Sequence, residues 1–217
     1  MNARPDPLRV ELTLQQRRSL PVCVYYSAKL AREVVVQARC YWLGLWLDWA
    51  ADVRTYVERP RDPGNPNDAL ADFWVVYAGS ELLLDVAPEA KVTARVAPNA
   101  WALTENGYVA IDESRGRITP HWAWGRRALL LGLEQAHPYA VAASLQDGLK
   151  LTCSALLKNW PAEGRSVREA CSRAGANPYV VQSAIFHLVR TGHLNIDWTH
   201  GISWDSVLTR KEHASQD

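Results

Sequence analysis

Two aspartates in a predicted β-hairpin are the residues of this sequence best suited to do chemistry. Asp72 precedes the first apolar strand and Asp85 lies in the second. Pairing the strands about a turn at residues 79–80 predicts Trp74 opposite Asp85 and Asp72 opposite Ala87. The alternation of a strand then puts both carboxylates on one face and leaves the other face apolar, packed on a core. Two carboxylates this close indicate a divalent-metal site, with Mg²⁺ as the expected ion.

Four short motifs surround this hairpin. They are Asp48-Trp49-Ala50-Ala51-Asp52-Val53, Tyr56-Val57-Glu58-Arg59-Pro60, Ala71-Asp72-Phe73 and Leu84-Asp85-Val86-Ala87-Pro88. In this order and spacing they resemble TnsA, the endonuclease subunit of heteromeric transposases, from about Lys29 to the C-terminus. The resemblance implies a restriction-endonuclease-like fold that nicks DNA with Mg²⁺ held by Asp72 and Asp85. It also implies DNA, a transposase subunit and an AAA+ regulator as partners.

The chain departs from the pattern of that family at two catalytic positions. Counting back from Asp48 places Cys40 where the family has a glutamate, which removes a hard oxygen ligand. Ala87 stands where the family has a lysine, which removes the cation that would stabilise charge on the scissile phosphate. Glu33 and Lys91 are candidate replacements for the missing glutamate and the missing lysine. We therefore expect a degenerate nuclease site.

Composition sets outer bounds on the partners. The chain has 217 residues, 48% of them hydrophobic, and a net charge of +1, so DNA contacts must come from local patches such as Arg126-Arg127, whose alternative interpretation is a solvated surface. Four cysteines without zinc-site spacing are expected to be free, buried thiols. With no bilayer-length apolar run, we expect a cytoplasmic protein without membrane contact.

Hydrophobic periodicity divides the first part of the chain. Residues 1–26 read as an N-terminal arm, and residues 27–148 as the nuclease-like domain. Spacing of three to four residues from Ser27 to about Ala50 predicts a helix capped by Ser27, whose tryptophans serve as core packing or, alternatively, as a base-stacking platform. A further strand at 107–111, a turn at 114–116 and a helix at 126–135 are expected to complete a mixed sheet flanked by helices.

Residues 149–217 are predicted to form a winged helix-turn-helix domain with a C-terminal tail. Helices are expected at 151–157, at 166–171 with a Ser166/Glu169 capping box, and at 179–190, followed by a wing strand at 192–197. A DNA-reading third helix would present one set of residues to a major groove: Asn177, Tyr179, Gln182, Ser183, His187 and Arg190. Many winged helices contact proteins instead, and both interpretations stay open.

The sequence thus predicts a two-domain α/β protein that acts as a TnsA-like transposition component, binding DNA ends or transposase partners with a degenerate nuclease site. One alternative is an active Mg²⁺-dependent DNA-nicking endonuclease, and without activity no cofactor is expected. Another is a DNA-binding regulator that reads sequence with its winged helix and dimerises through the nuclease-like domain.

Overall fold

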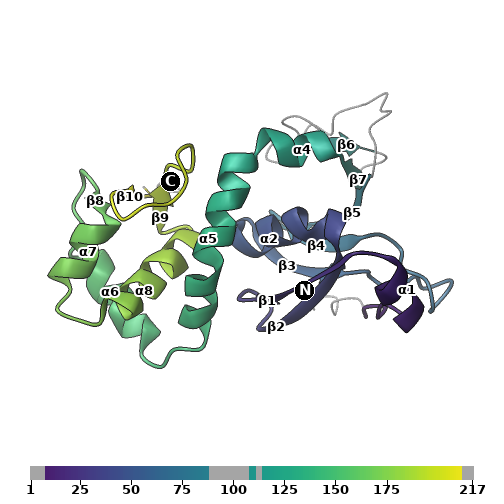
Figure 1. Ribbon diagram of the computed structural model, residues 1–217, viewed down its shortest axis with the longest axis horizontal. Helices are drawn as coiled ribbons and strands as arrows, with labels where there is room; N and C mark the ends of the chain where they lie inside the picture. The colour runs from purple at the N-terminus through teal and green to yellow at the C-terminus, as the bar shows by residue number, and fades with distance from the viewer. Residues whose placement is uncertain (1–7, 88–107, 111–113, 212–217) are drawn as a thin grey trace. The chain divides into compact units, whose positions relative to one another are not determined.

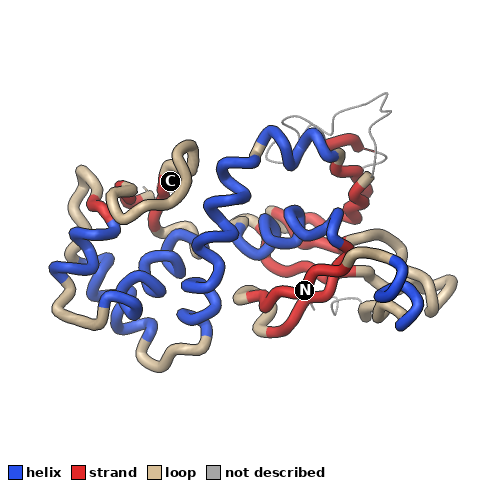
Figure 2. Tube along the Cα trace, in the orientation of Figure 1, coloured by secondary structure: helices blue, strands red, loops and turns tan. Residues whose placement is uncertain are grey.

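The computed structural model describes residues 8–87, 108–110 and 114–211, and the chain divides into two compact units, Met1–Arg127 and Ala128–Asp217. Helices and strands are mixed in both (Figures 1 and 2). Helix α5 (Arg127–Ser144) falls almost wholly in the second unit, whereas the sequence-based division at residue 148 assigns it to the first.

A five-stranded mixed sheet is the frame of the first unit, which confirms the α/β class. Its order is β3–β4–β5–β7–β6, formed by β3 (Val53–Glu58), β4 (Phe73–Tyr77), β5 (Ser80–Val86), β7 (Arg115–Ile118) and β6 (Tyr108–Ala110). All neighbours are antiparallel except β5 and β7, which are parallel. The turn predicted at 114–116 is wrong, since Arg115 and Gly116 lie in β7.

The β4–β5 hairpin has the predicted faces but not the predicted register. Its turn is Ala78-Gly79, both at positive φ as in a type I′ turn, so Trp74 pairs with Leu83 rather than with Asp85. The register is shifted by two residues, and an even shift keeps every side chain on its expected face. Phe73, Val75 and Leu84 are accordingly fully buried.

The helix predicted from Ser27 is wrong in its first half. Residues 22–37 form an antiparallel hairpin of β1 (Val22–Ser27) and β2 (Arg32–Gln37), and part of the expected N-terminal arm belongs to it. The consecutive valines at 34–36 favour a strand because β-branched side chains fit a pleated sheet. A 3₁₀ turn, η1 (Ala38–Cys40), then leads into α2 (Tyr41–Trp49).

Helix α2 is a core helix of the first unit. Every residue from Leu43 to Trp49 is buried, which confirms the core interpretation for Trp46 and Trp49, while Trp42 is half-buried. Trp46 meets Trp122 edge to face at 5.8 Å between ring centroids. Trp122 belongs to α4 (Pro120–Gly125), so the helices on this sheet are joined by aromatic contact.

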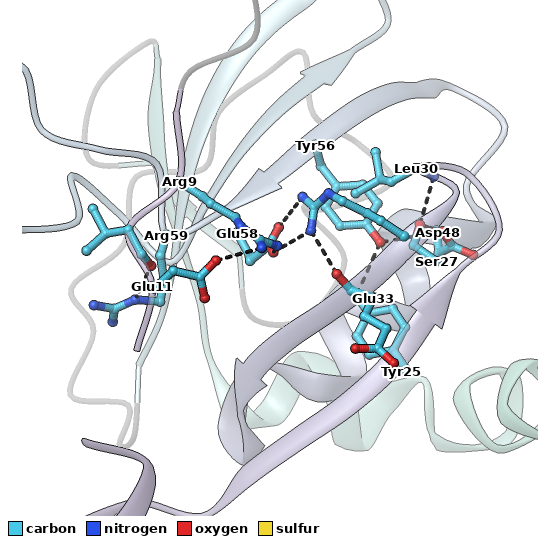
Figure 3. A network of polar contacts seen from close by, with 12 residues as sticks. Arg9, Glu11, Tyr25, Ser27, Leu30, Glu33, Asp48, Tyr56, Glu58 and Arg59 are labelled. Carbon is cyan, nitrogen blue, oxygen red and sulfur yellow. Dashed lines mark hydrogen bonds and ion pairs between the residues drawn. The ribbon is translucent and has the colours of Figure 1, made fainter. Parts of the chain in front are cut away.

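Glu58, at the end of β3, anchors three segments of the first unit through one buried carboxylate (Figure 3). Arg32 of β2 donates to it in bidentate fashion, Nη1 to Oε1 and Nη2 to Oε2, each at 2.6 Å. Arg9 donates to Oε1 at 3.0 Å, and the segment that carries it continues into α1 (Leu14–Ser19). Charge-assisted bonds of this kind hold the β1–β2 hairpin and the N-terminal segment to the sheet.

A second polar cluster fixes α2 against the β1–β2 hairpin. The buried carboxylate of Asp48 accepts hydrogen bonds from the Ser27 hydroxyl and the Lys29 backbone N–H. The Lys29 ammonium donates to the backbone carbonyls of Leu47 and Ala50 at the end of α2 and of Val53 at the start of β3, with distances of 2.6 to 2.7 Å. A cation at a helix C-terminus satisfies orphan carbonyls and complements the helix dipole. Ser27 is therefore not the N-cap of the helix. It is far from the start of α2 in sequence and bonds to the side chain of Asp48 within that helix.

The second unit follows the predicted order of elements. After α5 come α6 (Leu149–Lys158), β8 (Arg165–Ser166), α7 (Val167–Arg173), α8 (Pro178–Arg190), β9 (Leu194–Ile196) and β10 (Val207–Arg210), with the strands in the order β8–β10–β9. The Ser166/Glu169 capping box of α7 is confirmed. A core of buried residues that includes Val181, Ile185 and Leu208 joins these helices to the small sheet.

Across the part of the chain that the structure describes, none of the helices has both the length and the apolar character required to cross a bilayer.

Replacing Arg32 with methionine should destabilise the first unit. The substitution leaves the buried Glu58 carboxylate without its bidentate partner, so we expect the free energy of unfolding to fall by about 2 to 3 kcal/mol. Urea denaturation followed by circular dichroism measures this. The matched control is Arg168→Met, which breaks the exposed Arg168–Asp205 pair and should cause no measurable loss. An equal effect of the two variants would contradict the anchoring role of Glu58.

Candidate functional site

A cleft of about 720 Å³ lies at the open end of the β4–β5 hairpin, opposite its turn, and the candidate catalytic residues line it. Asp72, just before β4, and Asp85, in β5, both line it. Continuing the observed register by one residue places these two positions opposite each other, closer than the sequence predicts. Four arginines and four aspartates line the cleft, so its ionisable side chains balance: Arg39, Arg59, Arg115 and Arg117 against Asp62, Asp68, Asp72 and Asp85.

Both oxygens of Asp72 are hydrogen-bond acceptors. Arg39 Nη2 donates to Oδ1 at 2.8 Å, and the backbone N–H of Val86 donates to Oδ2 at 2.8 Å. Arg39 also donates through Nη1 to the Val86 carbonyl and through Nε to Gln37 Oε1. The guanidinium of Arg39 thus ties η1, the start of β4 and the end of β5 together.

Burial dominates the electrostatics of Asp72. It raises the pKa of this carboxyl, and the negative charge of Asp85 raises the pKa further. The Val86 N–H and Arg39 lower the pKa without cancelling the rise. The rise thus follows from loss of solvent around the carboxyl, although an arginine is bound to it.

Asp85 is held by a different arginine. Arg115, in the neighbouring parallel strand β7, donates to Asp85 Oδ2 through Nε at 3.0 Å and through Nη2 at 2.8 Å. Arg117 follows two residues later on the same strand, and its side chain is exposed in the cleft. Each of the two candidate metal ligands is therefore already paired with a guanidinium.

Cys40 lies beside Asp72. Its thiol is hydrogen-bonded to the Asp72 carboxylate, and it is buried at the end of η1. Burial raises the pKa of Cys40 strongly, and the Asp72 charge adds to that rise. The thiol is thus a neutral hydrogen-bond donor and a poor ligand, because metals bind the thiolate. Ala87, at the end of β5, also lines the cleft and supplies no charge.

The two proposed replacements do not complete the site. Glu33 is an exposed residue of β2 that lies outside the cleft lining, and Lys91 lies outside the described residues. Within the described ranges, histidine, cysteine, aspartate and glutamate side chains form no group of three or more that could hold a metal ion. The donor set near Asp72 consists of two arginine-bound carboxylates and a protonated thiol, which fits Mg²⁺ poorly.

The arginines are what sequence reasoning missed. Arg39 is adjacent to Cys40 in sequence, but its role depends on a 3₁₀ turn that the predicted helix concealed. Arg115 was expected in a turn, and only its place in a parallel strand brings it to Asp85. An alternating Arg-Gly-Arg-Ile pattern at 115–118 is a weak strand signal that could have indicated it.

The residues predicted to read DNA are mostly turned inward in α8. Gln182 and Ser183 are 7% and 4% exposed, and His187 and Arg190 are half-buried. Phe186 of the same helix contacts Tyr139 of α5 at 5.5 Å between ring centroids. Only Tyr179 and the N-cap residue Asn177 are well exposed, so α8 presents its first turn rather than a full face.

Arg126 and Arg127 pack on tryptophans near the end of the first unit. The guanidinium of Arg126 lies 5.1 Å from the ring centroid of Trp122, and that of Arg127 lies 5.1 Å from Trp124. Trp124 is 67% exposed. These cation–π contacts account for both arginines structurally and leave the Arg127–Trp124 pair at the surface.

Comparison with known proteins adds no assignment: the sequence matches no protein-family model, and no curated protein is significantly similar to it.

The stability of the protein should carry a pH signature of Asp72. Because its pKa is raised above the usual 3.8 in the folded state, the folded protein binds this proton more tightly than the unfolded chain. The contribution of Asp72 to stability is therefore complete below about pH 3.8 and is lost as pH rises through the raised pKa. We expect the free energy of unfolding of the wild type, minus that of Asp72→Asn, to fall across this window in urea titrations. Parallel curves for the two proteins would contradict the buried position of the carboxyl.

Of the two cysteines in the first unit, Cys40 should be alkylated more slowly. Its thiolate is disfavoured by burial and by Asp72, whereas Cys23 is half-buried. We expect iodoacetamide to modify Cys23 first and Cys40 only as fast as the protein unfolds, measured by peptide mass spectrometry. In urea both should react alike. Fast modification of Cys40 in the folded protein would contradict the protonated, buried thiol.

Proposed function

We propose that this protein is a TnsA-like component of a DNA transposition system that binds DNA without cutting it. In this proposal the first unit is a restriction-endonuclease-like domain with a degenerate site, and the second is a winged-helix domain. The observation that carries the proposal is the pairing of Asp72 with Arg39 and of Asp85 with Arg115 inside one cleft.

The arginine pairs support binding because they neutralise the two carboxylates. Two aspartates alone would repel the phosphates of a nucleic acid, and a metal-dependent nuclease offsets that repulsion with its ions. Here Arg39 and Arg115 supply the positive charge permanently. The exposed Arg117 on β7 is then available in the cleft for a phosphate oxygen.

The same pairs argue against cleavage. A metal ion activates a water molecule and stabilises the leaving oxygen, whereas a guanidinium offers only N–H donors. The thiol of Cys40 and the methyl group of Ala87 provide neither a ligand nor a cation for the reaction. A site with charge balance but no activating group is suited to hold DNA, not to hydrolyse it.

The topology of the second unit supports its proposed class. Helices α6, α7 and α8 alternate with strands in the order helix–strand–helix–helix–strand–strand, and the strands form one antiparallel sheet. This order is consistent with the proposed winged helix and supports it. Because Gln182 and Ser183 are buried, the unit is better suited to contact a protein than to read a groove. A transposase subunit or an AAA+ regulator is the proposed partner.

DNA binding should be independent of divalent metal. We expect the wild type to bind duplex DNA equally in EDTA and in Mg²⁺, and to leave supercoiled plasmid unnicked in Mg²⁺ or Mn²⁺. Arg115→Gln exposes the Asp85 charge, so it should weaken binding in EDTA by about tenfold, with partial recovery in Mg²⁺. Fluorescence anisotropy gives the affinities and agarose gels the nicking.

Arg54→Gln is the matched control for these measurements. Arg54 is exposed on β3 outside the cleft, so this variant should bind DNA as the wild type does.

Two outcomes would contradict the proposal. Metal-dependent nicking that Asp72→Asn abolishes would establish an active nuclease instead. Failure of the wild type to bind any DNA would overturn the proposal.

A further inference from the structure

A second hollow, of about 340 Å³, adjoins the cleft in the first unit. The two share Arg39, Val86 and Ala87, so the same short stretch of chain borders both. The walls of the hollow are apolar and aromatic, with Trp42 from α2 and Trp122 from α4 among them. Its volume is at the lower end of the range for pockets that hold small ligands.

Two polar groups in the lining of this hollow lack partners. Thr119 is 3% exposed and Trp122 is 1% exposed. Neither the Thr119 hydroxyl nor the Trp122 indole N–H has a hydrogen-bond partner among the described residues. Buried polar groups are paired in the great majority of cases, so two orphans in one apolar pocket call for a specific explanation.

Thr119 is unusual because of its position in the helix. It is the N-cap of α4, where a threonine hydroxyl normally accepts a backbone N–H of the first turn. Here no such side-chain bond forms. Only the backbone carbonyl of Thr119 accepts a hydrogen bond, from the backbone N–H of Trp122 at 3.0 Å. The Thr119 hydroxyl therefore lacks the usual capping bond to a backbone N–H of α4, although it is buried beside the hollow.

We infer that this hollow receives a single unpaired nucleobase from DNA bound in the cleft, an inference that rests on the proposed function. A base is a flat heteroaromatic ring with hydrogen-bonding edges. The half-buried Trp42 provides the stacking surface, the Trp122 indole N–H donates to a ring nitrogen or carbonyl, and the Thr119 hydroxyl donates or accepts. Arg39 borders both hollows and lies where the sugar-phosphate backbone would pass from one to the other.

The inference predicts a preference for DNA with an unpaired base. An unpaired base enters the hollow without the cost of breaking a base pair, so we expect about tenfold tighter binding of a duplex with one extra adenine than of the same duplex without it. Fluorescence anisotropy in EDTA measures both affinities. Thr119→Val, which keeps the shape and removes the hydroxyl, should lose most of this preference, as should Trp42→Leu.

A matched variant and a stability measurement complete the test. Trp124→Leu removes an exposed tryptophan outside the hollow and should keep the preference. Thr119→Val should also unfold at a higher urea concentration than the wild type, because it deletes a buried group without a partner. If the wild type binds both duplexes equally, or if Thr119→Val retains the preference, the inference is overturned and the proposed function stands. Absence of binding to either duplex would overturn both.

Discussion

The buried carboxylate of Glu58 is the constraint on which the first unit depends. It binds Arg32 from the β1–β2 hairpin and Arg9 from the N-terminal segment, so three parts of the chain must meet before its charge is balanced. The next residue, Arg59, has a φ of +50° and donates its backbone N–H to the Asp72 carbonyl. The ion pair of Glu58 is thus adjacent in sequence to the backbone hydrogen bond between Arg59 and Asp72. By fixing the end of β3, the ion pair helps to fix the position of Asp72 in the cleft.

In the cleft, each of the two candidate carboxylates is paired with a guanidinium group. A divalent ion and a guanidinium both neutralise a carboxylate, but only the ion exchanges with solution and polarises a bound water. Arg39 is fixed by bonds to Gln37, Val86 and Asp72, so it cannot leave and return as an ion does. Such a site has a constant electrostatic character, which is consistent with the proposed role in binding DNA.

The sequence predicted what depends on local pattern and failed where distant partners decide. Alternation along β4 and β5 gave the correct faces for Asp72 and Asp85, and the Ser166/Glu169 box gave the start of α7. Val34 fitted the helical spacing from Ser27 to Ala50, but the run of valines at 34–36 pairs with β1 as a strand. Arg115 meets Asp85 because β7 adds in parallel to β5, a contact that local spacing does not encode.

Parallel pairing of β5 and β7 also sets the order in which the cleft can be assembled. The β4–β5 hairpin closes over two residues, whereas parallel neighbours need a crossover, and Asp85 is separated from Arg115 by 30 positions. Loop-closure entropy opposes the longer contact, so we expect the hairpin to form before the contact between Asp85 and Arg115. A ligand that contacts both β5 and β7 in the cleft therefore binds only after the two strands have paired. By mass action, such a ligand stabilises the folded protein.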